Sequence, residues 1–113
     1  MSCLFCRIVN GEIPADRVYE DDEMVAFTDI KPGAPMHVLI VPREHIASLN
    51  DLRSEHDRLL GAMHRRAASL AAARGYAESG FRTVINCNAD AGQTVFHLHL
   101  HVLAGRSLSW PPG

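Results

Sequence analysis

Three histidines, His97, His99 and His101, lie within five residues of one another near the carboxyl end of the chain. The residues that alternate with them are leucine, leucine and valine. Because successive side chains of a β-strand point to opposite faces, a strand here would direct its apolar residues to the core and all three imidazoles to the other face. Packing alone does not explain three histidines opposite a wholly apolar face, so the pattern indicates a site of chemistry.

Two kinds of chemistry compete for this row of histidines. Histidines two residues apart on a strand can share a zinc ion. The Cα atoms of His97 and His101 would be roughly 13 Å apart on a straight strand, too far for all three rings to bind one ion at about 2.0–2.1 Å. The alternative is attack on phosphorus, because a neutral imidazole is a good nucleophile that also leaves readily. Neighbouring histidines would then bind or protonate oxygens.

The segment just before the histidines, residues 91–95, favours the phosphate chemistry. Gly92 allows the backbone to approach an anion closely, and successive N–H groups can form an anion-binding nest. Gln93 and Thr94 add side-chain donors. We therefore predict nucleophilic chemistry on a phosphate held by this loop.

Composition narrows the class of protein. The chain has 113 residues, 47% of them hydrophobic, and a net charge of −2, which predicts a single domain spanning residues 1–113. The charge argues against broad binding to nucleic acid. No apolar run approaches the ~20 residues that cross a membrane, and the first residues lack the pattern of a signal peptide. We therefore expect a cytoplasmic protein without a membrane partner.

Periodicity predicts an α+β domain with an antiparallel sheet, a long helix and a short amino-terminal helix. The strands are expected at residues 17–19, 24–28, 37–41, 81–86 and 96–103, and the helices at 3–10 and 54–74. Ser54 and Asp57 have the spacing of a capping box at the start of the long helix. Its apolar stripe, which we interpret as core packing, comprises Leu59, Leu60, Met63, Ala67, Leu70 and Ala71.

Other metal-ligating residues carry weaker signals. Cys3 and Cys6 have the two-residue gap of half a zinc site, and the alternative is two free thiols in a short helix. His56 and His64 lie in the long helix, where solvent-facing positions explain them without a function.

The sequence GQTVFHLHLHV at residues 92–102 resembles the signature of the histidine triad superfamily, in which three histidines alternate with apolar residues. The resemblance extends over nearly the whole chain, through residues 26–37, which are similar to the family's nucleoside-binding segment, and residues 41–46. The ending SWPPG resembles the tail of the Hint branch, the nucleoside phosphoramidases. The chain departs from the commonest Hint pattern at Thr94, where serine is frequent.

The resemblance implies a role for each histidine of the run. His99 would attack the α-phosphorus and form a nucleotidyl-histidine, and His101 would contact the phosphate oxygens. His97 would support His99, partly through its backbone carbonyl, with His37 behind it. The implied reaction converts an adenosine 5′-phosphoramidate into AMP and an amine, with no cofactor for catalysis.

The resemblance also implies a purine-nucleotide site. Asp29 would accept hydrogen bonds from the ribose hydroxyls. The phosphate would be held, and the leaving group assisted, by Asn86, Gly92, Gln93 and Thr94. The purine pocket would be lined by Phe5, Ile8, Ile13, Phe27 and Ile30. For Phe5 and Ile8, ordinary core packing is an alternative interpretation.

Two further expectations follow from the resemblance. It implies a homodimer with a continuous sheet, in which Trp110 of the tail approaches the partner's site. It also implies a structural zinc on Cys3, Cys6, His45 and His97, since some bacterial members resemble this arrangement. Hint relatives without the cysteines hold the residue matching His97 through the residue matching His37.

Three rival functions remain open at this stage. They are dinucleoside polyphosphate hydrolysis, a purine-nucleotide-binding regulatory module, and a metal carrier that uses the histidines. The Hint-like tail argues against the first of them.

Overall fold

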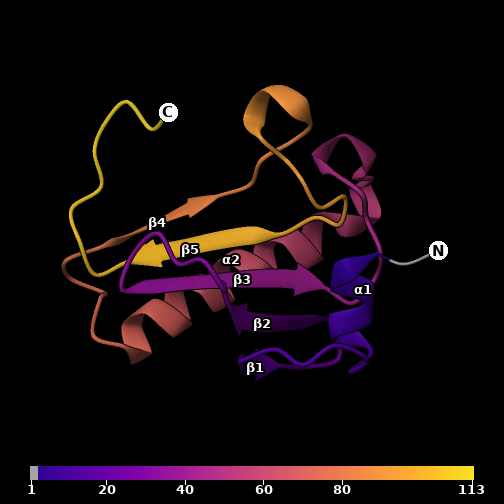
Figure 1. The fold of residues 1–113 in the computed structure, drawn as a ribbon, viewed down its shortest axis with the longest axis horizontal. Helices are drawn as coiled ribbons and strands as arrows, with labels where there is room; N and C mark the ends of the chain where they lie inside the picture. Colours follow the sequence, from indigo (N-terminus) through magenta and orange to yellow (C-terminus); the bar gives the residue numbers. More distant parts are fainter. Residues whose placement is uncertain (1–2) are drawn as a thin grey trace.

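The computed structural model describes residues 3–113, which form a five-stranded antiparallel sheet with helices on both faces (Figure 1). The strand order is β1-β2-β3-β5-β4, and every neighbouring pair is antiparallel. The strands are β1 (Arg17–Glu20), β2 (Met24–Thr28), β3 (Met36–Pro42), β4 (Phe81–Val84) and β5 (Leu100–Ala104). The predicted fold class is confirmed.

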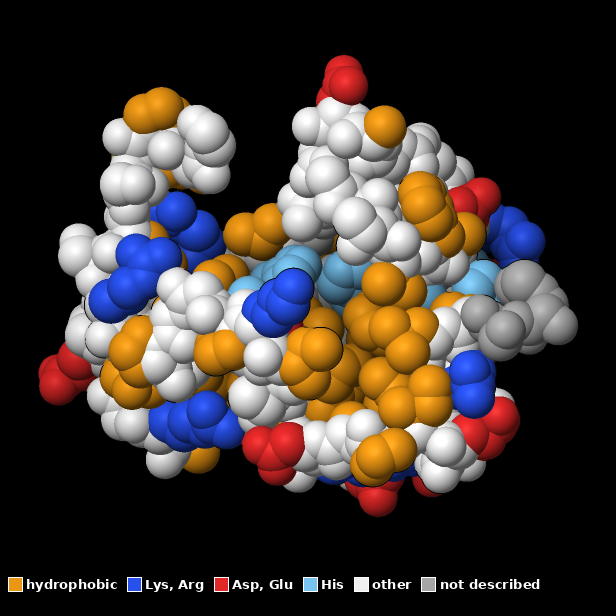
Figure 2. Space-filling model, in the orientation of Figure 1, with side chains coloured by type: hydrophobic (Ala, Val, Ile, Leu, Met, Phe, Trp, Pro, Cys, Tyr) orange, Lys and Arg blue, Asp and Glu red, His pale blue; other side chains and the backbone are white. Residues whose placement is uncertain are grey.

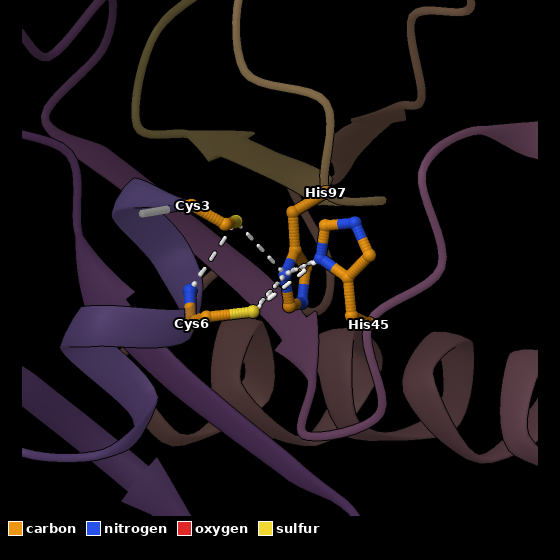
Figure 3. A group of neighbouring side chains, drawn as sticks. All are labelled: Cys3, Cys6, His45 and His97. Carbon is orange, nitrogen blue, oxygen red and sulfur yellow. Dashed lines mark hydrogen bonds between the residues drawn. The ribbon is translucent and has the colours of Figure 1, made fainter. Parts of the chain in front are cut away.

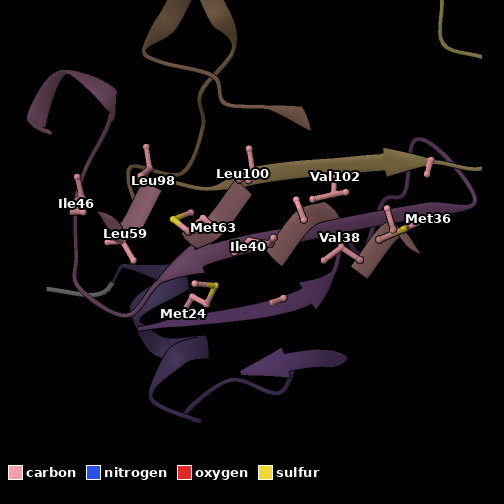
Figure 4. Packing of buried hydrophobic residues seen from close by; sticks show 14 residues of the cluster. Met24, Met36, Val38, Ile40, Ile46, Leu59, Met63, Leu98, Leu100 and Val102 are labelled. Carbon is pink, nitrogen blue, oxygen red and sulfur yellow. The ribbon is translucent and has the colours of Figure 1, made fainter. Parts of the chain in front are cut away.

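The long helix α2 (Asp57–Ala73) packs on one face of the sheet and forms the larger core (Figure 4). Leu59, Met63, Ala67 and Ala71 are its buried residues, which confirms the predicted stripe; Leu60 and Leu70 are partly buried at its margin. Every residue of β3 is buried, as expected of a continuous apolar strand with helices over both faces.

The short helix α1 (Leu4–Val9) covers one end of the opposite face. Phe5, Ile8 and Val9 form a second cluster with apolar residues of β2 and β3. Phe27 and Leu39 are direct cross-strand partners in this cluster. Because α1 is only six residues long, it does not cover the whole of this face, and Leu39 and His101 beside it line a cavity.

The start of the long helix differs from the prediction. Residues Ser54–His56 form a 3₁₀ turn and α2 begins at Asp57, so the predicted capping box of Ser54 and Asp57 is wrong. The turn is held instead by His56, whose Nδ1 accepts from the backbone N–H of Arg53 at 3.0 Å.

His56 is also not solvent-facing, because only 4% of it is exposed and its Nε2 lies 3.1 Å from a carboxylate oxygen of Glu44. His64 is exposed as expected.

Both carboxyl-terminal strands are shorter than predicted. β4 ends at Val84 and β5 begins at Leu100, so His97 and His99 precede the strand and only His101 lies within it. The cause is a contact outside the sheet: the backbone N–H of Leu98 donates to the carbonyl of Ile46 at 2.6 Å. Residues 85–99 therefore form a loop that rises above the sheet edge (Figure 1). Leu98, Leu100 and Val102 still face the core under α2 as predicted, but burial does not alternate, because His97 and His99 are buried as well.

Among residues 3–113, no helix is both long enough and apolar enough to cross a membrane.

Candidate active site

A cavity of about 600 Å³ lies on the α1 side of the sheet and brings most of the predicted nucleotide-binding residues together. Figure 2 shows histidine side chains in pale blue at the bottom of a hollow between the loop of residues 85–99 and a group of hydrophobic side chains. The predicted residues that line the cavity are Phe5, Ile8, Ile13, Phe27, Asp29, Ile30, Asn86, Gly92, Thr94, His99 and His101.

The apolar residues of this lining differ in how deeply they are buried. Phe5, Ile8 and Phe27 are buried and Ile13 is partly buried, so they form an apolar wall. Ile30 is 93% exposed and lies at the rim. This arrangement places an apolar wall beside the loop that carries Gly92 and Thr94 and beside the histidines.

The ring of His99 is held in one tautomer by the backbone. Its Nδ1 lies 2.8 Å from the carbonyl oxygen of His97. Because a carbonyl only accepts, Nδ1 carries a proton, and in the neutral ring Nε2 keeps a free lone pair. The edge of the ring also packs against Phe5, with centroids 5.0 Å apart at 87°. His99 is therefore a fixed imidazole with one unprotonated nitrogen in the wall of the cavity.

A second hydrogen-bond chain reaches His101 through His37. The backbone N–H of Gly33 donates to Nδ1 of His37 at 2.8 Å. A neutral His37 therefore carries its proton on Nε2, which lies 2.9 Å from Nδ1 of His101. Burial, with smaller contributions from His99 and His37, lowers the pKa of His101 to about 4. At neutral pH His101 is thus an uncharged ring that accepts at Nδ1.

The position of His37 corrects one prediction. His37 was expected behind His97, but it contacts His101. The sheet register explains this, because His37 pairs with Leu103 and Leu39 with His101 across β3 and β5. His37 and His101 are therefore diagonal neighbours on one face, whereas His97 lies beyond the end of β5. We name these two residues the His37–His101 pair.

Asp29 lies next to this pair, with its Oδ2 3.4 Å from Nε2 of His37. Asp29, His37 and His101 present ligand atoms close enough together for a metal ion. However, Nε2 of His37 is the protonated nitrogen, and a protonated nitrogen does not bind a metal. The geometry favours a hydrogen-bond chain at this position.

Gln93 has a different place from the one predicted. It is buried, its Oε1 accepts from the N–H of Asn88 at 2.8 Å, and its Nε2 donates to the carbonyls of Ala47 and Val95. Both amide hydrogens are engaged inside the protein, so the prediction that this side chain donates to a phosphate is wrong. Gln93 instead anchors the loop to which Gly92 and Thr94 belong.

Four side chains of types that bind metal ions, one of them His97, converge in a separate group (Figure 3). We call Cys3, Cys6, His45 and His97 the cysteine–histidine cluster. Nδ1 of His97 lies 3.4 and 3.5 Å from the two sulfur atoms and 3.3 Å from Nδ1 of His45. Nε2 of His97 donates to the carbonyl of Pro42 at 2.8 Å, which leaves Nδ1 without a proton.

The cluster has the dimensions of a tetrahedral zinc site. Zinc–sulfur bonds of about 2.3 Å and zinc–nitrogen bonds of about 2.0–2.1 Å place sulfur and nitrogen ligands about 3.5 Å apart and two nitrogen ligands about 3.3 Å apart. The distances in the cluster, 3.3–3.5 Å, match both values. Burial, together with the Cys3 thiol, raises the pKa of the Cys6 thiol, so the metal-free cluster favours protonated sulfur there.

Trp110 lies outside the cavity. It is 80% exposed on the carboxyl-terminal tail, and the guanidinium carbon of Arg82 lies 5.9 Å from its ring centroid. Figure 1 shows this tail extending away from the sheet.

Sequence reasoning anticipated the backbone carbonyl of His97 but missed the other backbone groups that orient the site. The carbonyls of Pro42, Ile46 and Ala47 and the N–H of Gly33 each fix a site residue or its loop. Such groups occur in every residue and carry no signature. Leu39, which also lines the cavity, could have been found from its alternation within the 37–41 strand.

The family model described as "Scavenger mRNA decapping enzyme C-term binding" matches residues 2–109. The chain belongs to the histidine triad family. A histidine triad hydrolase structure from Legionella pneumophila is 51% identical, with a TM-score of 0.98 over 99% of this chain and 100% of that one. The purine nucleoside phosphoramidase of Escherichia coli is 47% identical over 93% of this chain and 88% of its own length.

A zinc-bound histidine triad protein from Mycobacterium smegmatis is 40% identical, with a TM-score of 0.82 over 94% of this chain and 76% of that one. Together with the site geometry, these relatives identify the chain as a histidine triad hydrolase.

Proposed function

We propose that this hydrolase is a purine nucleoside phosphoramidase that converts adenosine 5′-phosphoramidates into AMP and an amine. The observation that carries the proposal is the tautomer of His99, whose Nδ1 donates to the His97 carbonyl beside a cavity of nucleotide size. The Escherichia coli relative of that name supports it.

The reaction would proceed in two steps through His99. First, Nε2 of His99 attacks the α-phosphorus, the phosphorus–nitrogen bond breaks, and the amine leaves with that electron pair and gains a proton. Then water attacks the same phosphorus, its proton is removed, and the bond to His99 breaks to release AMP. The N–H groups near Gly92, the Thr94 hydroxyl and His101 would stabilise the phosphate charge, so we propose no cofactor for these steps.

The nucleoside would lie along the apolar wall. The purine would pack against Phe5, Ile8, Ile13, Phe27 and Ile30. Asp29, at the polar end of the cavity, would accept from the ribose hydroxyls, and Asn86 would assist at the phosphate.

The test compares substrates with purified protein. Adenosine phosphoramidate should be hydrolysed with a kcat/KM well above that for diadenosine polyphosphate, and His99→Ala should fold but lose nearly all turnover. A trapped nucleotidyl adduct should map to His99 and to neither His97 nor His101. Faster cleavage of the dinucleotide would favour the polyphosphate hydrolase. Tight AMP binding without turnover would favour a regulatory module.

We also propose that the cysteine–histidine cluster holds a structural zinc ion. The distances of the cluster and the zinc-bound Mycobacterium smegmatis relative support this. With four protein ligands the ion would join α1 to the segment before β5, and no coordination position would remain for water. Such a closed site also argues against a metal carrier.

Finally, we propose that the chain acts in the cytoplasm as one domain and forms a homodimer. β4 is an edge strand of the sheet, and Phe81 on it is 38% exposed, so a partner strand could extend the sheet there. In such a dimer, Trp110 would approach the partner's cavity.

Sedimentation at micromolar concentration should give the mass of a dimer, and a monomer alone would refute the dimer. Deleting residues 108–113 should change the preference for leaving groups more than the folding.

A further inference from the structure

His37 has one ring proton and two neighbouring acceptors. Its Nε2 lies 2.9 Å from Nδ1 of His101 and 3.4 Å from Oδ2 of Asp29. Its other nitrogen is occupied, because it accepts the N–H of Gly33 at 2.8 Å. The single Nε2–H of His37 therefore faces two acceptors, and in this structure it is hydrogen-bonded to the nearer one, the imidazole of His101.

The outcome of this sharing sets the chemistry of His101. As a neutral ring, His101 carries one proton on one of its two nitrogens. When its Nδ1 accepts from His37, its own proton must be on Nε2, where it can donate to a phosphate oxygen or a leaving group. When the His37 proton points to Asp29, no other hydrogen bond among residues 3–113 fixes His101 in that tautomer.

Asp29 is held in place to compete for this proton. Its backbone N–H donates to the carbonyl of His37 at 2.9 Å, and its Oδ1 accepts the N–H of Lys31 at 2.8 Å. The side chains of Asp29 and His37 are only 19% and 10% exposed. The same carboxylate lies in the wall of the cavity.

We propose that Asp29 and His37 couple recognition of the sugar to catalysis. This inference rests on the proposed function, in which ribose hydroxyls donate to Asp29. Bound hydroxyls satisfy the carboxylate, the His37 proton then goes to His101, and His101 directs its own N–H at the phosphate. No proton leaves His37; only its acceptor changes, while His101 re-protonates by exchange with water. The substrate class is therefore ribonucleotide, and the selection is exerted on kcat as well as on binding.

The kinetic test uses adenosine phosphoramidate and its 2′,3′-dideoxy analogue. In the unmodified protein the analogue should lower kcat by roughly tenfold, part of the ~10²–10⁴-fold that positioned acid–base groups supply, in addition to raising KM. His37→Gln supplies an amide with two N–H groups near the Nε2 position, which can donate to Asp29 and His101 together. In this variant the two kcat values should become nearly equal while the difference in KM persists.

His64→Gln, at an exposed histidine of α2, is the matched control and should behave as the unmodified protein. An analogue that changes only KM in the unmodified protein, or a kcat ratio that is the same in His37→Gln, would overturn the coupling.

A second measurement does not depend on turnover or on a variant. The ¹⁵N resonances of the His101 ring report its tautomer, and AMP should move His101 towards the Nε2–H form more than 2′,3′-dideoxy-AMP does. Identical His101 resonances in the two complexes would overturn the proposal. If AMP shifts the tautomer but phosphoramidates are not hydrolysed, the proposed function fails and the coupling stands. If AMP does not bind, both fail.

Discussion

The two outer histidines of the run have opposite hydrogen-bonding arrangements. His97 donates from Nε2 to the carbonyl of Pro42 and turns a bare Nδ1 towards Cys3, Cys6 and His45. His101 accepts at Nδ1 from His37, and its residue lines the cavity. Burial lowers the pKa of both rings, so burial does not distinguish them.

What distinguishes the two histidines is the neighbouring group that fixes the tautomer. A backbone carbonyl next to His97 leaves its Nδ1 free for the proposed zinc ion, and a histidine donor next to His101 leaves its Nε2–H for the proposed substrate. The proposed structural and catalytic sides of the site therefore lie four positions apart in the chain, at His97 and His101, with His99 between them. Four experiments test this division.

Replacing His101 should have the largest effect. His101→Ala removes the group proposed to donate to the phosphate, so kcat/KM should fall by ~10²–10⁴-fold. The cysteine–histidine cluster does not include His101, and the zinc content should stay unchanged. Enzyme assay and metal analysis on the same preparation check both statements, and lost zinc would show that the two sides are not separate.

Replacing Asp29 should weaken nucleotide binding without affecting the metal. Asp29→Asn replaces a charged acceptor with a neutral one, and hydrogen bonds to charged groups contribute about 1.5–3 kcal/mol each. Loss of the equivalent of one such hydrogen bond should raise the Kd for AMP by roughly 10- to 150-fold, with poorer discrimination against 2′-deoxy-AMP. Calorimetric titration measures both, and Asp22→Asn, at an exposed turn, is the control. Equal shifts for the two nucleotides would mean that Asp29 does not read the sugar.

Replacing both cysteines of the cluster should remove the metal and leave the nucleotide site intact. The Cys3→Ser/Cys6→Ser variant should lose a stoichiometric zinc ion and about 2–3 kcal/mol of stability, the contribution of a ligand present at ~100 times its Kd. Catalysis should be largely kept. Metal analysis and thermal unfolding test this, with Cys87→Ser as the matched control, since Cys87 is not in the cluster. Equal zinc in the double variant would contradict the site.

Lowering the pH should have the smallest of the four effects, a decrease in the free energy of unfolding. Because the folded protein holds the pKa of His101 near 4, below its ordinary value of 6.5, the unfolded chain binds a proton first as the pH falls. The free energy of unfolding should therefore decrease between pH 6.5 and pH 4, by up to about 2 kcal/mol from pH 7 to pH 5.

Urea unfolding in the presence of a chelator measures this loss without interference from zinc. In His101→Gln the loss should be smaller but not absent, because burial also lowers the pKa of His97. An unchanged pH dependence would exclude His101 as its source.

The sequence by itself determined the elements whose signals are local. The apolar stripe of α2 and the alternation of Leu98, Leu100 and Val102 predicted the buried faces, because side-chain direction follows directly from helix and strand geometry. The pair Cys3 and Cys6 predicted half a metal site by spacing, and the triad pattern predicted the family.

Only the tertiary structure decided how the site is oriented. The start of β5 at Leu100, the partner of His37 and the inward side chain of Gln93 all depend on contacts between segments far apart in the sequence. Most of the contacts that set them involve backbone carbonyls and N–H groups, which every residue has and no sequence pattern marks. The residue types thus specified which chemistry was available, and the backbone around them fixed which nitrogen of each histidine performs it.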